Sequence, residues 1–453
     1  MQFEIIARCP VTKARVSRMT LAHGPTMLPT FMPVATQAAI KGLTPQQVES
    51  LGITLILNNT YHLNLRPGIE VLDAAGGAHA FQGWKRNLLT DSGGFQLVSL
   101  SQFTKITEEG ALFASPFDGE MTMLSPEQSM AIQHSIGADI IMQLDDVVPS
   151  LLTGPRVEEA MWRSVRWLDR CIAYHEKSGR HTRQNLFAIV QGGLDKRLRE
   201  SCLDEMIGRR EHVAGYAVGG LSGGEAKDDF WRIVKQCTDK LPTDRPRYCM
   251  GIGFAEDLLV CVALGIDMAD CVFPTRTARF GVALTWRGPL NIRLAKHAKE
   301  MTPIDRDCPC PTCKGGMTRA FLHHLIAEET VAAHAITQHN IVFQASLMGR
   351  ARDAIVAGTF PEFLRSFFKT YYSSNPNSSS GNRKGREKRK PATKDENEDK
   401  KTETEKIENE SGPTYPKWCV DALRSVGVDI LEGVPNARVV DGNGAKWDYA
   451  EAS

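Results

Sequence analysis

The sequence predicts an α/β protein whose core is a (β/α)8 barrel, with a smaller subdomain appended after it. The chain has 453 residues, enough for one large barrel with additions. Hydrophobic residues make up 42% and charged residues 24%, which is typical of a globular chain with a full core. Short β-rich runs alternate with segments that carry apolar residues at helical spacing, as parallel strands and their covering helices do.

Eight such runs are predicted to be the strands of the barrel. They are Phe31–Ala35, Ile53–Asn58, Asn87–Asp91, Asp139–Leu144, Leu186–Gln191, Gly215–Gly220, Arg247–Gly253 and Met268–Phe273. The fourth and fifth are almost wholly apolar, as strands buried on both faces should be. An open Rossmann-like sheet is the alternative, but no G-x-G-x-x-G sequence follows an early strand.

The segments between the strands contain the predicted helices. Pro155–Glu176 and Gly224–Lys240 show apolar residues at helical spacing after polar or glycine starts. The stretch 95–125 is long for a connection between a strand and a helix. We expect it to form a small hairpin or lid of its own.

Composition divides the chain into four segments. Residues 1–285 carry the barrel pattern, and residues 286–372 leave the alternation, which indicates a subdomain with closing helices. Residues 373–411 contain almost no apolar side chains and are predicted to be a disordered charged insertion. Its basic block, Arg383–Lys390, is better explained as a solvated linker than as an RNA contact or a nuclear signal. Residues 412–453 are predicted to form a C-terminal helix and tail.

The charge balance gives no global basic field. Lys and Arg number 54 and Asp and Glu 53, a net charge of +1, so binding of a nucleic acid would need a local patch. The longest apolar stretch, Leu258–Ile266, is too short to cross a bilayer, and the N-terminus lacks the apolar core of a secretory signal. Eleven cysteines in such a chain indicate reduced thiols in a cytosolic compartment.

Polar residues set among glycines end several predicted strands. They are Asp91, Asp145, Gln191, Gly220 and Asp270. In a barrel these groups meet at one mouth, where carboxylates and an amide could recognise a base edge and carry out substitution at an acetal-like carbon. One such Asp alone would favour a helix N-cap or a loop salt bridge. Five polar positions in register favour a site.

A tight cysteine cluster lies in the predicted subdomain. Cys308, Cys310 and Cys313 have the C-x-C-x2-C spacing of metal ligands, and one imidazole would complete a closed, structural Zn²⁺ site. Three free thiols in a loop are the alternative. Spacing does not select the fourth ligand among the histidines that follow, which are His323, His324, His334 and His339.

Arginines follow the last predicted strand. Arg276 and Arg279 come shortly after Asp270, and arginines beside such a carboxylate suit phosphate clamping. A solvated basic loop is the alternative.

Long motifs around these residues resemble one known family. They are NTYHLNLRPG, LLTDSGGFQLVSL, ITEEG, GADIIMQLDDV, VQGG, GGLSGGE, DCVFPTRTAR and CPCPTC followed by HN. Through them the chain resembles the tRNA-guanine transglycosylase family, and within it the eukaryotic catalytic subunits, over residues 1–372 and 412–430. The resemblance implies a TIM barrel with a zinc-binding subdomain.

The resemblance also implies a pentosyltransferase that exchanges a base in tRNA without cutting the chain. Members remove guanine at the wobble position (34) of tRNAs with a GUN anticodon, those for aspartate, asparagine, histidine and tyrosine, and insert queuine. Asp270 matches the nucleophile, which attacks the ribose anomeric carbon and holds a covalent tRNA intermediate, and Asp91 matches the proton acceptor. We expect Asp270 to stay ionised beside Arg276 and Arg279.

Binding residues follow from the same resemblance. The base site matches Asp91, Ser92, Gly93, Gly94, Asp145, Gln191, Gly220 and Leu221, with Phe95 and Met250 on the faces of the base. The tRNA-contacting loops match Gly251, Ile252, Gly253, Phe254, Ala255, Glu256, Asp257, Thr275, Arg276, Thr277, Ala278 and Arg279. The zinc ligands match Cys308, Cys310, Cys313 and His339.

Two positions favour queuine over the smaller base that bacterial members use. Gly223 stands where those members usually carry Val, and Val147 where they carry Cys, so a missing side chain leaves room for a larger base. The resemblance further implies a heterodimer with a homologous, inactive accessory subunit, a homodimer being the alternative. The resemblance also implies a cytoplasmic location, with peripheral attachment at the mitochondrial outer membrane.

Other functions explain less of the sequence. A non-catalytic, tRNA-binding accessory subunit would not need Asp91, Asp145 and Asp270 in intact motifs. A glycoside or nucleoside hydrolase on the same barrel shares the carboxylates but leaves the cysteine cluster and the TRTAR sequence unexplained. An archaeal-type transglycosylase would bring a C-terminal RNA-binding domain, for which the residues after 412 are too few.

Overall fold

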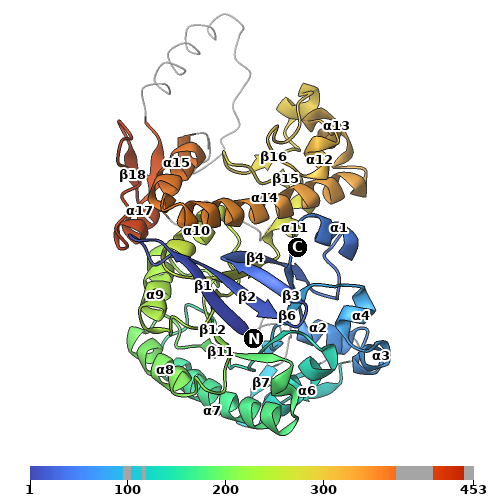
Figure 1. Ribbon diagram of the computed structural model, residues 1–453. Coiled ribbons are helices and arrows are strands. Elements are labelled where there is room, and N and C mark those ends of the chain that lie inside the picture. The colour runs from blue at the N-terminus through green and yellow to red at the C-terminus, as the bar shows by residue number, and fades with distance from the viewer. Residues whose placement is uncertain (95–103, 115–118, 374–411, 443–453) are drawn as a thin grey trace, which may run out of the picture.

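Eight parallel strands close into a barrel in the order β10-β11-β12-β13-β14-β4-β5-β6, in a computed structural model that describes residues 1–94, 104–114, 119–373 and 412–442 (Figure 1). The strands are β4 (Thr30–Ala35), β5 (Leu55–Asn58), β6 (Asn87–Thr90), β10 (Ile140–Met142), β11 (Asn185–Val190), β12 (Gly215–Val218), β13 (Arg247–Cys249) and β14 (Met268–Cys271). Each overlaps one of the predicted runs, with β4 and β11 beginning one residue earlier than predicted, and the (β/α)8 prediction is confirmed.

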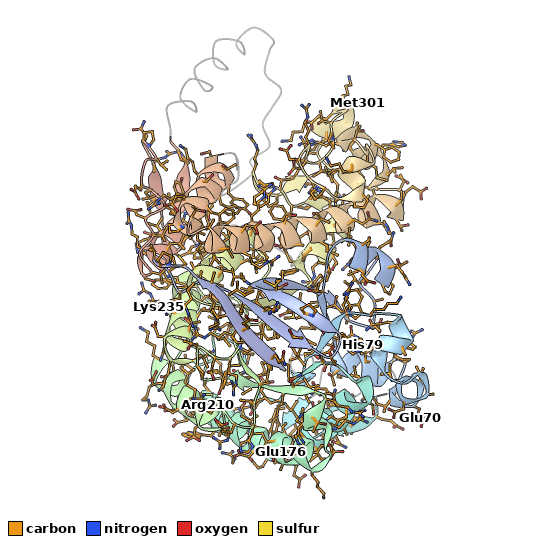
Figure 2. All side chains as sticks on the ribbon, viewed as in Figure 1. Glu70, His79, Glu176, Arg210, Lys235 and Met301 are labelled. Atoms are coloured by element: carbon orange, nitrogen blue, oxygen red, sulfur yellow. The ribbon has the colours of Figure 1, made fainter. Side chains whose placement is uncertain are left out.

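Helices cover the outside of the barrel. After β4 to β6 come α1 (Pro45–Ser50), α2 (Thr60–Leu65), α3 (Ile69–Ala75), α4 (Ala78–Gln82) and α6 (Pro126–Ile136). After β10 to β14 come α7 (Pro155–Lys177), α8 (Lys196–Gly208), α9 (Lys227–Lys240), α10 (Ala255–Ala263) and α11 (Phe273–Arg279). Many of their charged residues face outward, as Figure 2 shows for Glu70 in α3, Glu176 in α7 and Lys235 in α9.

Local sequence explains where these helices begin and end. Ser125 precedes α6, and its side chain accepts the backbone N–H of Gln128 while the Gln128 side chain accepts the Ser125 N–H, a reciprocal cap. Gly137 ends the same helix in the left-handed conformation, at a φ of 75°.

An N-terminal antiparallel sheet closes the end of the barrel where the strands begin. It contains β1 (Gln2–Arg8), β2 (Arg15–Leu21) and β3 (Gly24–Leu28). Met19, Leu21 and Leu28 share one buried cluster with the side chains that fill the barrel interior. This end therefore has a dry apolar plug, and the opposite end is left for a site.

The stretch 95–125 contains the predicted hairpin. In its described part, β7 (Thr104–Ile106), β8 (Ala111–Ala114) and β9 (Met121–Leu124) form a three-stranded antiparallel sheet. Phe95 and residues 374–411, most of the predicted disordered insertion, lie outside the described residues.

The chain after the barrel forms a subdomain around one long helix. It contains β15 (Val282–Ala283), β16 (Leu290–Asn291), a 3-10 turn at Ala295–Lys299, α12 (Pro311–Lys314), α13 (Arg319–Leu325), α14 (Thr330–Val356) and α15 (Phe360–Ser373). A second 3-10 turn, Arg180–Thr182, follows α7 in the barrel. Helix α14 contacts α11 and β4 of the barrel as well as α12 (Figure 1). It thus connects the subdomain to the barrel wall.

The C-terminal segment returns to the barrel. It contains β17 (Thr414–Pro416), α17 (Lys417–Arg424) and β18 (Arg438–Val440), and α17 packs on α9 and α10. In the part of the chain that the structure describes, no helix is both long and apolar enough to cross a membrane.

Candidate active site

The polar residues predicted at strand ends lie at one rim of the barrel. Asp91, Asp145 and Gln191 follow β6, β10 and β11, and Asp270 lies near the end of β14. Since the strands are parallel, their carboxyl ends share this rim. The structure therefore brings the four side chains together from positions far apart in the sequence.

Asp145 is buried at the centre of one hydrogen-bonded group. Its Oδ2 accepts the side-chain amide of Gln191 at 2.6 Å, and its Oδ1 accepts the Ser92 hydroxyl at 3.2 Å. Burial raises the pKa of Asp145 to about 6, because these neutral donors only partly offset the loss of water. A carboxylate held in this way can exchange its partners for the N–H groups of a bound base.

Glycines allow this group to pack closely. A Cβ at Gly220 would lie 2.4 Å from the Gln191 Oε1, and a Cβ at Gly94 would lie 3.0 Å from the Asp145 carbonyl. Gly93 and Gly220 also have positive φ, 84° and 67°. Leu221 and Met250 are half-buried beside the rim.

Asp270 is held by two donors, one from the neighbouring strand β13 and one from the loop that follows it. The Tyr248 hydroxyl and the Gly251 N–H donate to its Oδ1 at 2.5 Å and 2.9 Å. Burial raises the pKa of Asp270, while these two bonds oppose the rise. Burial, together with the charges of Asp270 and Asp91, holds the pKa of Tyr248 well above its usual range, so Tyr248 remains a donor.

The arginines do not neutralise Asp270, which corrects the expectation from the sequence. Arg276 and Arg279 lie on α11 with exposed side chains, and Arg279 donates to the Thr275 carbonyl at 3.1 Å. Among the described residues, neither forms an ion pair with Asp270 within 4.0 Å. The helix turns the two guanidinium groups to the surface, where they remain free for other anions.

Asp91 is oriented by the start of α2. The Asn59 side-chain amide donates to its Oδ2 at 2.6 Å, and the Thr60 N–H donates to its Oδ1 at 2.9 Å. Both donors lie in the NTYHLNLRPG motif, whose role the sequence does not explain. They fix the direction in which the carboxylate points.

The segment 251–257 is more buried than a tRNA-contacting loop needs. Four of its residues are buried, namely Ile252, Ala255, Glu256 and Asp257. The Asp257 carboxylate forms an ion pair with the Lys227 ammonium group at 2.5 Å. Burial raises the pKa of Glu256 to about 7. Only Gly251, Phe254 and their neighbours on α11 reach the surface, so the buried side chains hold the segment in place.

Several residues that shape the rim carry no signal in the sequence pattern. Tyr248 lies inside a strand, and Arg199 lies in α8, yet both contact the predicted residues or their loops. Asp146, the second residue of the Asp-Asp pair, accepts Arg156 at 2.7 Å and Arg163 at 2.6 Å. This cluster of Asp146 and two arginines anchors the loop after β10. In the sequence, the doubled Asp is the signal that points to it.

Gly223 lies at the edge of the same mouth. A Cβ there would lie 2.7 Å from the Ser150 Oγ, so the loop after β10 occupies the space that a side chain would need. Nearby, Glu225 accepts the backbone N–H groups of Ser222 and Gly223 at 2.6 Å and 2.9 Å. A larger residue at 223 must displace Ser150.

The cysteine cluster forms a second, closed group. The ligand atoms of Cys308, Cys310, Cys313 and His339 lie within 4.8 Å of one another, and all four residues are buried. His339 Nε2 donates to the Leu284 carbonyl at 2.8 Å, so Nδ1 faces the sulfurs of Cys310 and Cys313 at 3.6 Å and 3.4 Å.

This donor set fits a metal ion. Three sulfur atoms and one imidazole nitrogen that converge in a buried group are donors that a thiophilic metal ion binds. His323 instead contacts the Ile292 carbonyl, and His334 contacts Gln47, so neither completes the set. With four protein donors and no open position, the site would be structural.

Another histidine group lies at the plugged end of the barrel. His23 Nδ1 and His79 Nε2 lie 2.8 Å and 3.4 Å from the Asp139 carboxylate, and their rings stack at 3.6 Å (His79 is labelled in Figure 2). His79 Nε2 also bonds the Arg86 carbonyl at 3.0 Å. Since these nitrogens already serve as donors, the group fastens the N-terminal sheet to the barrel.

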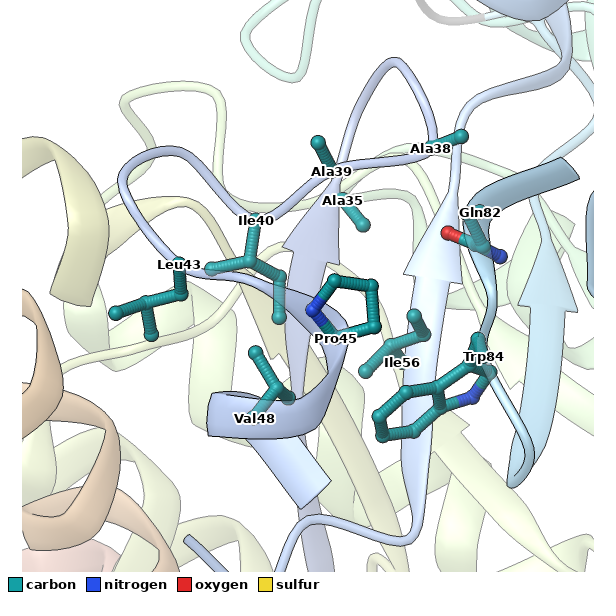
Figure 3. A pocket seen from close by; sticks show the side chains of 10 residues that line it. All are labelled: Ala35, Ala38, Ala39, Ile40, Leu43, Pro45, Val48, Ile56, Gln82 and Trp84. Atoms are coloured by element: carbon teal, nitrogen blue, oxygen red, sulfur yellow. The ribbon is translucent and has the colours of Figure 1, made fainter. Parts of the chain in front are cut away.

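A small cavity between β4, β5 and α1 has no such chemistry. Its lining is mostly apolar, from Ala35 to Trp84, with Gln82 as a polar side chain (Figure 3). Its volume is about 10 Å³, which is room for about one water molecule. It carries no titratable group and is distinct from the rim.

Known proteins resemble this chain over most of its length. A family model described as queuine tRNA-ribosyltransferase matches residues 9–373. The queuine tRNA-ribosyltransferase catalytic subunit of Schizosaccharomyces pombe is 49% identical over 437 residues, covering 95% of this chain and 98% of that protein. That of Caenorhabditis elegans is 48% identical, covering 82% and 91%. A queuine tRNA-ribosyltransferase of Caldanaerobacter subterraneus is 44% identical, covering 82% and 98%.

Proposed function

Because the chain belongs to the queuine tRNA-ribosyltransferase family, and is therefore a transferase that acts on tRNA guanosine, we propose that it exchanges guanine for queuine at wobble position 34 of GUN-anticodon tRNAs. The observation that carries this proposal is the pair of carboxylates at one rim, the buried Asp145 and the half-buried Asp270. Asp145 and Asp270 are held by neutral donors, which leaves their charge available to a substrate.

Asp270 is the proposed nucleophile. Its carboxylate oxygen forms a bond to the ribose anomeric carbon as the bond from that carbon to guanine breaks. Asp91 enters this step protonated, gives its proton to the departing base and becomes the carboxylate that the second step requires. The phosphodiester chain stays intact, and the ribose is held as an ester of Asp270. Tyr248 and Gly251 release part of their hold on the carboxylate as its charge disappears.

Asp91 is the proposed proton acceptor of the second step. The incoming base attacks the same carbon, the bond to Asp270 breaks, and the proton on the attacking nitrogen passes to Asp91. Two inversions at one carbon retain its configuration, as in retaining glycosidases. The hydrogen bonds from Asn59 and Thr60 keep the carboxylate in place for this transfer.

Asp145, Ser92, Gln191 and the backbone at Gly220 and Leu221 are proposed to read the base edge, with Met250 on one face. Arg276 and Arg279 are exposed on α11 beside Asp270 and are proposed to clamp tRNA phosphates, together with Gly251 and Phe254. Glu256 and Asp257 are proposed to support this surface from inside.

The Cys3His group is proposed to hold one structural Zn²⁺, because three thiolates and one imidazole are the ligands that zinc prefers. The partner is proposed to be a homologous accessory subunit, since the Schizosaccharomyces pombe relative is named a catalytic subunit. Attachment to mitochondria remains a prediction from the resemblance.

Exchange of radiolabelled guanine into a GUN-anticodon tRNA tests the proposal. The chain is assayed with and without an accessory subunit, beside Asp270→Ala. Label that enters only with Asp270 intact, and that queuine suppresses, is the expected result. Exchange only in the mixture would make the heterodimer the active unit. No exchange in either case would overturn the proposal and favour a tRNA-binding accessory role.

A further inference from the structure

One cation lies in the wall behind the rim with no acidic partner. Arg199 on α8 is 0% exposed, and no carboxylate of the described residues lies within 4.0 Å of its guanidinium. Burial lowers its pKa. A buried charge without a counter-charge is costly, and an apolar side chain of similar length would avoid that cost. Its presence therefore needs an explanation in what it touches.

Arg199 touches the two loops that frame the proposed base site. Its Nη1 donates to the Val190 carbonyl and its Nε to the Gly193 carbonyl, both at 2.8 Å, on either side of Gln191. Its Nη2 donates to the Gly219 carbonyl, also at 2.8 Å, next to Gly220. One planar group thus joins the ends of β11 and β12 through three donors.

The packing around Arg199 leaves these loops little freedom. A Cβ at Gly192 would lie 2.8 Å from the Arg199 backbone nitrogen, so the loop lies directly on α8. A Cβ at Gly220 would lie 3.3 Å from Arg199 Nη2. The Cys202 sulfur, one turn further along α8, accepts the Gln191 N–H at 3.2 Å. Helix α8 therefore fixes the position of the Gln191 backbone and the position of Gly220 opposite it.

We propose that Arg199 is a positioning residue for base recognition: its guanidinium sets the separation of the loops after β11 and β12, so that the Gln191 amide and the Gly220 backbone meet the same base. The inference rests on the proposed function, since it assigns the base site to these loops. Arg199 touches neither base nor ribose and acts through the two loops. Lysine can reach one carbonyl at a time, so charge alone does not replace the fork.

The test compares Arg199→Met and Arg199→Lys with Arg247→Met. Arg247 is a matched control, because it is buried, lies at the plugged end of the barrel and donates to the carbonyls of Leu241, Pro242 and Gly265. We expect both Arg199 variants to raise the KM for guanine by about tenfold or more and to leave the KM for tRNA unchanged. The control should lose stability and keep the guanine KM.

Amide hydrogen exchange on the same proteins gives a readout that does not depend on catalysis. We expect faster exchange in residues 190–194 and 218–221 of the Arg199 variants only. The proposal is overturned if the guanine KM rises in proportion to the loss of stability in all three variants. It is also overturned if the amide hydrogens of the two loops exchange at the rates of the unmodified chain. If the unmodified chain does not exchange guanine, the proposed function fails. The amide hydrogen exchange of the two loops then decides by itself whether Arg199 positions them.

Discussion

The carboxylates at the plugged end of the barrel are held by cationic or imidazole side chains, whereas Asp145 and Asp270 at the open rim are held by neutral donors, although Asp146 beside them is paired with Arg156 and Arg163. At the plugged end, Asp267 accepts two bonds from the Arg15 guanidinium, at 2.9 Å and 2.6 Å. Asp139 is buried there too, yet hydrogen bonds from His79 and His23 keep its pKa below the ordinary value. At the open rim, Asp145 and Asp270 are met by an amide, hydroxyls and a backbone N–H, and burial raises both pKa values.

This difference separates structural carboxylates from reactive ones. A carboxylate paired with a cation gains stability and loses reactivity, because its charge is already compensated. A carboxylate held by neutral donors lowers the stability of the fold, because its charge is not compensated. The same uncompensated charge can interact with a substrate. Replacement of a carboxylate that is paired with a cation should therefore mainly reduce stability. Replacement of a carboxylate that is held by neutral donors should mainly reduce activity.

The largest effect is expected from Asp270→Ala, compared with Asp267→Ala at the other end of the barrel. Loss of the proposed nucleophile should reduce guanine exchange by about 10⁴-fold or more, with little change in the free energy of unfolding. Asp267→Ala should leave the buried Arg15 guanidinium without its counter-charge, with only backbone carbonyls as partners, and cost about 3–5 kcal/mol of stability. Urea unfolding and label exchange measure the two. Equal stability losses in both variants would break the comparison.

The Cys3His group, proposed to hold a metal ion, is a third kind of buried group, and Cys310→Ser tests it. The variant should lose the bound metal in elemental analysis and several kcal/mol of stability, since zinc contributes about 10–16 kcal/mol to small zinc-dependent folds. His334→Ala is the control, because His334 lies outside the ligand set. Normal metal content in Cys310→Ser would contradict the assignment of this group.

Asp145→Asn and Asp139→Asn should change stability with opposite signs. The pKa of Asp145 is about 6 in the folded chain against an ordinary 3.8, so its carboxyl costs stability as the pH rises through this window. Asp145→Asn should therefore stabilise the chain by about 1–3 kcal/mol at pH 8, and less at pH 5, while it weakens guanine binding.

The paired carboxylate behaves in the reverse way. The lowered pKa of Asp139 contributes stability above its ordinary pKa, and this stability disappears as the pH falls through the folded value. Asp139→Asn should thus destabilise the chain at pH 8. Urea unfolding at both pH values checks the signs, and a destabilised Asp145→Asn at pH 8 would count against the distinction.

The smallest effect is expected from Gly223→Val. The new side chain must displace Ser150, whose Oγ would lie 2.7 Å from its Cβ. We expect queuine incorporation to fall by roughly tenfold relative to guanine exchange, since a misplaced loop narrows the mouth. Gly223→Ala should show a smaller loss. Unchanged use of queuine by the valine variant would remove Gly223 from the substrate choice.

The strands and the cysteine cluster could be predicted because their signals are local. All eight barrel strands overlap the runs expected from apolar patterning to within one residue at their starts for β4 and β11, and the C-x-C-x2-C spacing marks three donors directly. A strand such as β11 reports its burial through its own composition, and a helix such as α6 reports its ends through its own caps. Such features need no knowledge of what lies across the fold.

The partners of these residues depend on chain segments that only folding brings together. Arg15 and Asp267 are 252 residues apart, and Tyr248 meets Asp270 because β13 and β14 are neighbours in the barrel. The same holds for Arg199, whose three carbonyl partners come from two strand ends. Short-range periodicity tells which residues are buried, whereas the charge and reactivity of a buried carboxylate depend on the donor that the tertiary structure places beside it.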